Sequence, residues 1–134
     1  MPEFQQRGAE VACCSTDSQY SHLAWVNTPR NKGGIAGTAI PVIADFTKTV
    51  SRDYGVLFEA KGIALRGLFI INPEGTVMSE IVNFFSIGRS VDEAIRTLDA
   101  LQEAAKGAVC PANWSKGQSS INPKEAAKYF EKVK

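Results

Sequence analysis

The densest hydrophobic stretch of this chain lies between Gly62 and Asn83. From Leu65 to Ile71, every residue except Arg66 and Gly67 is large and apolar, so both faces of a strand there would be mostly apolar. Such a strand is typical of the interior of a sheet that helices cover on both sides. A tight turn at 72–75 (Asn-Pro-Glu-Gly) and a second strand from Thr76 to about Asn83 complete a predicted hairpin.

Arg66 is the one charged residue within the first strand of this hairpin. A buried guanidinium without a partner costs roughly several kcal/mol, so the pattern predicts an anion opposite it. Two interpretations stay open on chemistry alone. Arg66 forms a structural ion pair with an Asp or Glu, or it is aimed at a reacting anion.

Strands and helices alternate along the rest of the chain, which predicts an α/β layered fold with a mostly internal sheet. The predicted strands are 10–15 and 40–44. Asp17 or Ser18 caps a helix to about Asn27, and Asp45 or Thr47 caps another that stops before Gly55. The longest predicted helix starts at the capping box Ser90–Glu93 and ends at Gly107.

The composition changes after Gly107, so we predict a domain over 1–107 and a tail over 108–134. Residues 115–122 are polar and rich in Ser and Gly, which predicts an extended linker. Asn122, followed by Pro, Lys and Glu, is a second helix start, and the helix it opens is expected to dock through Ala126, Tyr129, Phe130 and Val133.

Composition and charge exclude several function classes. The chain has 134 residues, a formal net charge of +1 and no basic block, which argues against nucleic acid as a partner. No signal peptide and no run of roughly 20 apolar residues occur, so we expect a soluble, cytoplasmic protein without a membrane partner. The three cysteines, Cys13, Cys14 and Cys110, are expected to be reduced thiols. With His22 as the only histidine and no Cys-x-x-Cys pair, no metal site is predicted.

Five stretches, in order along the chain, resemble the typical two-cysteine peroxiredoxins. These thioredoxin-dependent peroxidases have a thioredoxin-like fold. The resembling stretches are 14–25 (CSTDSQYSHLAW), 51–57 (SRDYGVL), 66–71 (RGLFII), 88–93 (GRSVDE) and 109–114 (VCPANW). The resemblance implies an α/β, thioredoxin-like peroxiredoxin sheet flanked by helices, lacking the N-terminal strands and carrying a C-terminal tail helix.

The resemblance also implies a mechanism for reducing hydrogen peroxide and organic hydroperoxides. A peroxidatic thiolate attacks the peroxide and becomes a sulfenic acid, and a resolving cysteine of a partner subunit condenses with it to a disulfide that thioredoxin or a related dithiol reduces. Cys110 matches the resolving cysteine, Arg66 the arginine beside the peroxidatic thiolate, and Arg89 an arginine of the supporting network. A guanidinium near a thiolate favours the anion. The implied partners are peroxiredoxin subunits, in a homodimer or a ring of dimers, and no cofactor is implied.

The peroxidatic motif of the family, Phe-Val-Cys-Pro-Thr-Glu, does not occur in this sequence. Cys13 and Cys14 follow no such pattern, and nothing in the sequence near them would lower a thiol pKa. We therefore expect a partial peroxiredoxin that is inactive alone and lacks a cooperative native state unless a second chain fills its sheet. The alternatives are a non-catalytic module that pairs with full-length subunits, and a thioredoxin-like scaffold in which Cys110 is dispensable.

Overall fold

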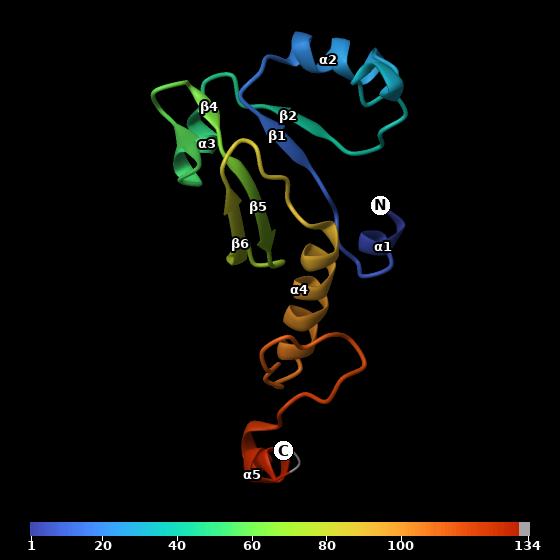
Figure 1. Cartoon of the computed structure of the whole chain (residues 1–134), viewed down its shortest axis with the longest axis vertical. Helices are drawn as coiled ribbons and strands as arrows, with labels where there is room; N and C mark the ends of the chain where they lie inside the picture. The colour runs from blue at the N-terminus through green and yellow to red at the C-terminus, as the bar shows by residue number, and fades with distance from the viewer. Residues whose placement is uncertain (132–134) are drawn as a thin grey trace. The chain divides into compact units, whose positions relative to one another are not determined.

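The computed structural model describes residues 1–131, and Figure 1 shows the order of their elements. Contacts divide the chain into two compact units, one made of 1–67 and 81–88, the other of 68–80 and the residues from Arg89 onward. The elements are α1 (Pro2–Gln5), β1 (Cys13–Ser15), α2 (Gln19–Asn27), the 3-10 helix η1 (Arg30–Lys32), β2 (Val42–Ala44), α3 (Thr49–Asp53), β3 (Leu57–Phe58), β4 (Ile63–Ala64), β5 (Arg66–Ile71), β6 (Val77–Asn83), α4 (Val91–Ala104), the 3-10 helix η2 (Pro123–Glu125) and α5 (Ala126–Phe130).

The first unit starts with a strand–helix–strand segment. β1 and β2 pair in parallel, with Cys14 opposite Ile43, and α2 is part of the connection between them. Ser18 caps α2, because its hydroxyl accepts a hydrogen bond from the Ser21 amide at 3.2 Å. The predicted α/β alternation and the predicted cap are both confirmed here.

Asp45 organises the turn that follows β2. It is 3% exposed, and its carboxylate accepts hydrogen bonds from the Val50 and Ser51 amides and from the Ser51 hydroxyl, at 3.0, 2.7 and 2.7 Å. Burial on its own would raise the pKa of Asp45, but these hydrogen bonds outweigh it and hold the pKa below its usual range. Asp45 therefore stabilises the first turn of α3 as predicted, although the cap position itself is Lys48, with φ at 62°.

The predicted hairpin is present as β5 and β6. In its turn, the Asn72 and Gly75 amides donate to the Thr76 and Asn72 carbonyl oxygens, both at 2.9 Å, and Gly75 has φ at 84°. The predicted burial of β5 on both faces is wrong, because its end residues are exposed and its interior residues are only half-buried. Each of the three sheets in residues 1–131 has two strands, so every strand has one neighbour and keeps solvent access.

Few large side chains are fully covered in the part of the chain that the structure describes. The buried apolar residues are Val56, Ala94 and Trp114, whereas Tyr20, Leu23, Phe46 and others expose more than half of their surface. A mostly internal sheet, as predicted, is therefore not found. Within 1–131, none of the helices combines the length and the hydrophobicity needed to cross a membrane.

The second unit is built on α4. Ser90 caps it by accepting from the Glu93 amide at 3.2 Å, which confirms the first half of the predicted capping box. In the second half of a capping box, the Glu93 carboxylate would accept from the Ser90 amide. The structure instead has this carboxylate accepting from Arg96 and Thr97. The predicted second helix start is a 3-10 turn, η2, in which the Asn122 side chain accepts from the Lys124 amide at 3.0 Å, and α5 follows it. Of the four expected docking residues, Ala126 and Tyr129 are half-buried, Phe130 is exposed and Val133 lies outside the described residues.

Candidate functional site

Arg66 is the first residue of β5 and belongs to the first unit. The prediction that it is buried opposite an anion is wrong. Its side chain is exposed, and its Nε–H donates to the carbonyl oxygen of Phe85 at 3.1 Å rather than to a carboxylate. The reason is its position at the end of the strand, where apolar neighbours do not enclose it. An exposed guanidinium is able to bind an anion, because it carries five N–H donors in a planar fork.

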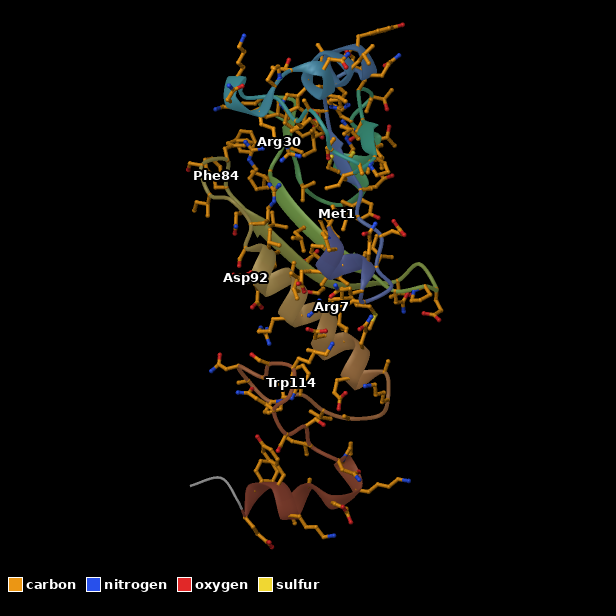
Figure 2. The ribbon with its side chains drawn as sticks, turned by 90° about the vertical axis from the view of Figure 1, so that its right-hand side faces the viewer. Met1, Arg7, Arg30, Phe84, Asp92 and Trp114 are labelled. Carbon is orange, nitrogen blue, oxygen red and sulfur yellow. The ribbon has the colours of Figure 1, made fainter. Side chains whose placement is uncertain are left out.

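Three aromatic rings lie together in the first unit, and one of them belongs to Phe85, whose carbonyl oxygen accepts from Arg66. Phe58 stacks edge-on against Phe85 and Phe84, with ring centroids 5.5 and 6.2 Å apart, and the Phe84 and Phe85 rings are 4.7 Å apart. The Lys61 ammonium lies 5.3 Å from the centre of the Phe85 ring. Figure 2 labels Phe84, which is 56% exposed. The rings fix the backbone at Phe85, and this backbone holds Arg66.

Arg89 lies in the second unit, directly before the Ser90 cap of α4, and its side chain is exposed. Asp92 and Glu93 follow in the first turn of the helix, where the positive end of the helix dipole stabilises their carboxylates. The structure thus places the predicted Arg66 in one unit and the predicted Arg89 and Cys110 in the other.

Cys13 and Cys14 are both free and exposed. Desolvation raises the pKa of the Cys14 thiol, and the negative charges of Asp45 and Cys13 raise it further. Cys13 donates from Sγ to the Pro41 carbonyl oxygen at 3.5 Å. The surroundings of Cys14 therefore oppose the thiolate form that an attack on peroxide requires.

Near this thiol pair, His22 is buried and its Nε2 lies 2.8 Å from the Ser15 hydroxyl oxygen, while its Nδ1 has no hydrogen-bond partner. It borders an open cavity of about 290 Å³, whose other lining residues are Gln19, Leu23, Val26, Thr38, Ile40 and Val42. Within residues 1–131, no group of three or more His, Cys, Asp or Glu side chains is arranged to hold a metal ion.

Cys110 lies at the start of a loop that returns to its own base. Val109 and Ile121 close this loop, because each donates its amide to the carbonyl oxygen of the other, at 2.9 and 2.8 Å. We call residues 109–121 the Cys110 loop. Cys110 is half-buried, and its Sγ–H donates to the Ala100 carbonyl oxygen of α4 at 3.6 Å. The predicted extended linker at 115–122 is wrong, since most of it belongs to this closed loop.

Trp114 anchors the Cys110 loop. It is 3% exposed, and Figure 2 shows it in the loop that follows α4. Its indole Nε1–H donates to the Gln118 carbonyl oxygen at 3.1 Å, and the Gln118 side chain accepts from the Ser115 amide at 2.8 Å. Asn113 has φ at 61°, which directs the chain into this turn. The result is a compact loop fixed by its own side chains.

Arg96 of α4 joins the helix to this loop. Its Nε–H and Nη2–H donate to the two carboxylate oxygens of Glu93, and its Nη1–H donates to the Trp114 carbonyl oxygen, all at 2.7 Å. The hydrogen bond from Arg96 is the main reason why the pKa of Glu93 lies below its usual range. A guanidinium has the planar fork of donors that this arrangement needs.

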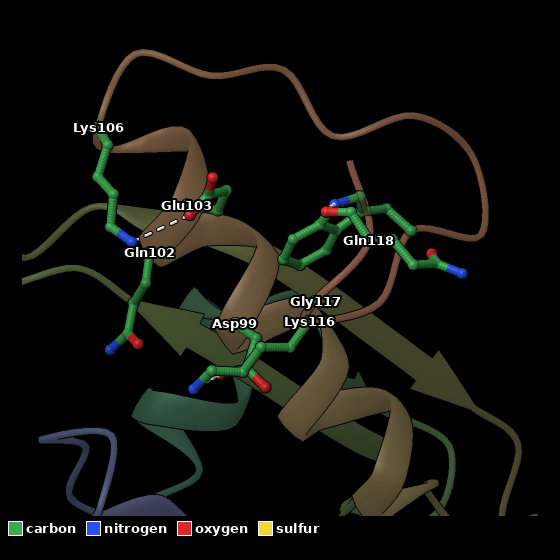
Figure 3. Close-up of a pocket in the computed structure, with 8 residues that line it drawn as sticks. Asp99, Gln102, Glu103, Lys106, Lys116, Gly117 and Gln118 are labelled. Atoms are coloured by element: carbon green, nitrogen blue, oxygen red, sulfur yellow. Dashed lines mark hydrogen bonds and ion pairs between the residues drawn. The ribbon is translucent and has the colours of Figure 1, made fainter. Parts of the chain in front are cut away.

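Two more side chains of α4 hold the loop. The Lys116 ammonium lies 3.3 Å from the carboxylate of Asp99, which is 7% exposed, and the Ser120 hydroxyl donates to the Glu103 carboxylate at 3.1 Å. Figure 3 shows the cavity of about 280 Å³ between this part of α4 and the loop. We call Glu93, Arg96, Asp99 and Glu103 the α4 stripe.

The α4 stripe was missed in the sequence analysis. Its members are spaced three, three and four residues apart, so they follow one face of the helix, while the apolar residues predicted for α4 recur at other positions. A polar set at this spacing was the available signal. The sequence analysis did not interpret this set, because nothing in the sequence shows that a polar loop returns to it.

Comparisons with known proteins identify the family of this chain. Residues 1–80 match the AhpC/TSA family, and residues 100–132 match the C-terminal domain of 1-Cys peroxiredoxin. Peroxiredoxin tpx1 of Schizosaccharomyces pombe is 53% identical over 131 residues, which cover 97% of this chain and 68% of that protein. The mitochondrial thioredoxin-dependent peroxide reductase of Homo sapiens is 49% identical over 134 residues, covering 98% of this chain and 52% of that protein.

Among solved structures, too, this chain resembles 2-Cys peroxiredoxins. The reduced 2-Cys peroxiredoxin of Plasmodium vivax superposes with a TM-score of 0.91 at 45% identity, covering 97% of this chain and 68% of that one. The chain thus has an α/β, thioredoxin-like peroxiredoxin fold, and it spans between about half and two-thirds of the length of these relatives. The chain therefore belongs to the AhpC/TSA family, as a typical two-cysteine peroxiredoxin sequence in which the peroxidatic motif does not occur.

Proposed function

We propose that this chain works in a thiol peroxidase of the peroxiredoxin type, which reduces hydrogen peroxide and organic hydroperoxides and supplies Cys110 as the resolving thiol. The family match over 1–80 and the relatives named peroxiredoxin and thioredoxin peroxidase support the reaction class. The position of Cys110 supports its role, since its half-buried thiol lies on a polar loop at the surface of α4.

In the proposed reaction, a peroxidatic thiolate of another subunit attacks the peroxide, takes one oxygen atom as a sulfenic acid and releases water or an alcohol. The Cys110 thiol then condenses with the sulfenic acid, forming a disulfide and releasing water. Thioredoxin or a related dithiol reduces this disulfide and becomes oxidised. Arg66 and Arg89 are assigned to the peroxide side of the site, where their charges favour the thiolate.

The chain alone is expected to be inactive, because neither Cys13 nor Cys14 replaces the missing peroxidatic cysteine. Its partners would be peroxiredoxin subunits, in a homodimer or a ring of dimers, and the reductant. A cytoplasmic location belongs to the same proposal. Fractionation of the source cells tests it, since one relative is named as mitochondrial.

Complementation tests the function. The purified chain is mixed with a full-length relative whose own resolving cysteine is replaced by serine, and hydrogen peroxide consumption is followed with thioredoxin and its reductase. We expect no turnover by either protein alone, turnover by the mixture, and none with Cys110→Ser. Turnover by the chain alone that Cys13→Ser/Cys14→Ser abolishes would show that the site assignment is wrong.

A second candidate function is a non-catalytic module that pairs with full-length subunits. The observation that favours it is the exposure of large apolar side chains, among them Tyr20, Phe46 and Ile87. In the complementation assay, such a module would form a complex with the full-length relative, and the Cys110→Ser chain would behave like the parent.

A further inference from the structure

His22 is a buried polar residue that the proposed function does not use. It lies on α2 in the first unit and is 6% exposed, and its Nδ1 has no hydrogen-bond partner within residues 1–131. A buried polar atom without a partner destabilises a fold, and such atoms are rare in native proteins. This nitrogen therefore needs a physical explanation.

The hydrogen bonds of Ser15 fix which nitrogen of His22 carries the proton. Ser15 Oγ lies 3.2 Å from Asp17 Oδ2, and a carboxylate only accepts, so the hydroxyl proton lies between these two oxygen atoms. The Asp17 amide donates to the same Oγ at 3.1 Å. Ser15 has no second proton to give, so its Oγ accepts from the Nε2–H of His22 at 2.8 Å. In the uncharged ring, Nδ1 is then a bare acceptor.

The cavity beside His22 is mostly apolar. Its volume is about 290 Å³, and its other lining residues are Gln19, Leu23, Val26, Thr38, Ile40 and Val42. Four of these six side chains are aliphatic, and neither of the two polar ones is charged. Ser15 and Asp17 are not among the lining residues, so His22 borders the cavity with the part of the ring that lies away from Nε2 and carries Nδ1.

We propose that this cavity is a binding site for a small, uncharged alcohol or phenol, whose hydroxyl group donates to Nδ1 of His22. The apolar part of the ligand packs against the aliphatic lining, as in most small-molecule sites, where a few polar groups fix the orientation. A charged ligand would lose its hydration without meeting an opposite charge. A ligand without a donor would leave Nδ1 unpaired. This inference does not rest on the proposed function.

The test uses the full chain and three probes of similar size. Phenol has a hydroxyl donor, toluene has a methyl group in its place, and benzoate carries a negative charge. Since His22 is the only histidine, its two ring nitrogens give the only imidazole signals in ¹⁵N NMR of the labelled chain. These signals report which nitrogen is protonated and whether Nδ1 gains a hydrogen bond.

In the free chain, we expect the signals of a ring with a protonated Nε2 and an unprotonated Nδ1. Phenol is expected to shift the Nδ1 signal saturably, towards that of a hydrogen-bonded nitrogen. Toluene is expected to bind roughly tenfold more weakly, because it makes no hydrogen bond to Nδ1. Benzoate is expected to leave both signals unchanged, since no cation lines the cavity.

Two variants separate the cavity from the acceptor. Val26→Phe fills the cavity and is expected to abolish the shift that phenol causes at His22. Its matched control is Val50→Phe, on α3 of the same unit, where the valine is 40% exposed and does not line the cavity. His22→Phe keeps a ring but removes the acceptor, so its affinities for phenol and toluene, followed by the backbone amides of α2, are expected to agree within about twofold.

Equal affinities of the parent chain for phenol and toluene would overturn the proposal, as would a Nδ1 signal that does not move at saturating phenol. The absence of phenol binding up to its solubility limit would mean that only water enters the cavity, and it would also overturn the proposal. If His22→Phe loses its structure, Val26→Phe decides, because it keeps His22 and its hydrogen bond to Ser15. None of these measurements uses peroxide or Cys110, so failure of the complementation assay would affect the proposed function alone.

Discussion

The β5–β6 hairpin and the Cys110 loop contrast in how well their side chains are covered. The hairpin carries the most hydrophobic sequence of the chain, yet Ile71, Val77, Met78 and Val82 each expose more than two-fifths of their surface. The Cys110 loop is polar, yet it contains one of the few buried apolar residues, Trp114, and is fixed by ion pairs and hydrogen bonds from α4. Hydrophobic sequence therefore does not by itself produce burial. Burial needs a second surface to pack against.

The exposed hairpin also explains why we expect this chain to associate. A two-stranded sheet leaves each strand with an unpaired edge, and an apolar edge favours pairing with other chains. The Cys110 loop has its backbone paired at Val109 and Ile121, so it does not share this tendency.

The largest expected effect comes from removing the anchor of the loop. Trp114→Ala is expected to cost about 3 kcal/mol of local stability, as for other buried aromatic residues. Hydrogen exchange of the Val109 and Ile121 amides, which close the loop, measures this change. The matched control is Val82→Ala in the hairpin, where the half-exposed side chain is expected to cost less than about 1 kcal/mol. Equal effects of the two substitutions would remove the contrast between the regions.

A smaller effect is expected from the cap of α4. Ser90→Ala removes the hydroxyl that accepts from the Glu93 amide, and it is expected to cost about 1 kcal/mol. Because α4 carries the stripe that holds the loop, amide exchange in the first turn of α4 and in the loop should speed up together. Ser86→Ala, at an exposed position before the helix, serves as the control. Faster exchange in α4 with an unchanged loop would show that the helix start and the loop are independent.

The smallest effect concerns pH. Hydrogen bonds from Arg96 hold the pKa of Glu93 below the usual range of a glutamate, and hydrogen bonds from Lys106 and Ser120 do the same for the pKa of Glu103. A carboxyl group whose pKa is lowered by folding stabilises the fold above its unfolded pKa, and this contribution is lost as the pH falls through the folded value. The loop should therefore loosen progressively below about pH 4.5.

Trp114 fluorescence in a Trp25→Phe background follows this transition. Glu93→Gln cannot change its charge and is expected to remove part of the pH dependence. A loop that opens only together with the whole chain, at the same pH in both proteins, would contradict this explanation.

Local signals in the sequence determined much of this protein. The Ser18 and Ser90 caps, the turn at 72–75 and the order of strands and helices follow from residues close together in the chain, and the structure confirms them. The motif stretches likewise identified the family, which the comparisons show. These features depend on backbone preferences and short-range hydrogen bonds, so neighbouring residues suffice to predict them.

Only the tertiary structure decided which surfaces meet. Arg66 was expected to be buried because its neighbours are apolar, but it is exposed, since β5 has one neighbouring strand and Arg66 begins it. Residues 115–122 were expected to form an extended linker, but Lys116 and Ser120 return to Asp99 and Glu103. Both outcomes depend on contacts between residues far apart in the chain. Side-chain burial and loop closure are set by those contacts, and local composition does not encode them.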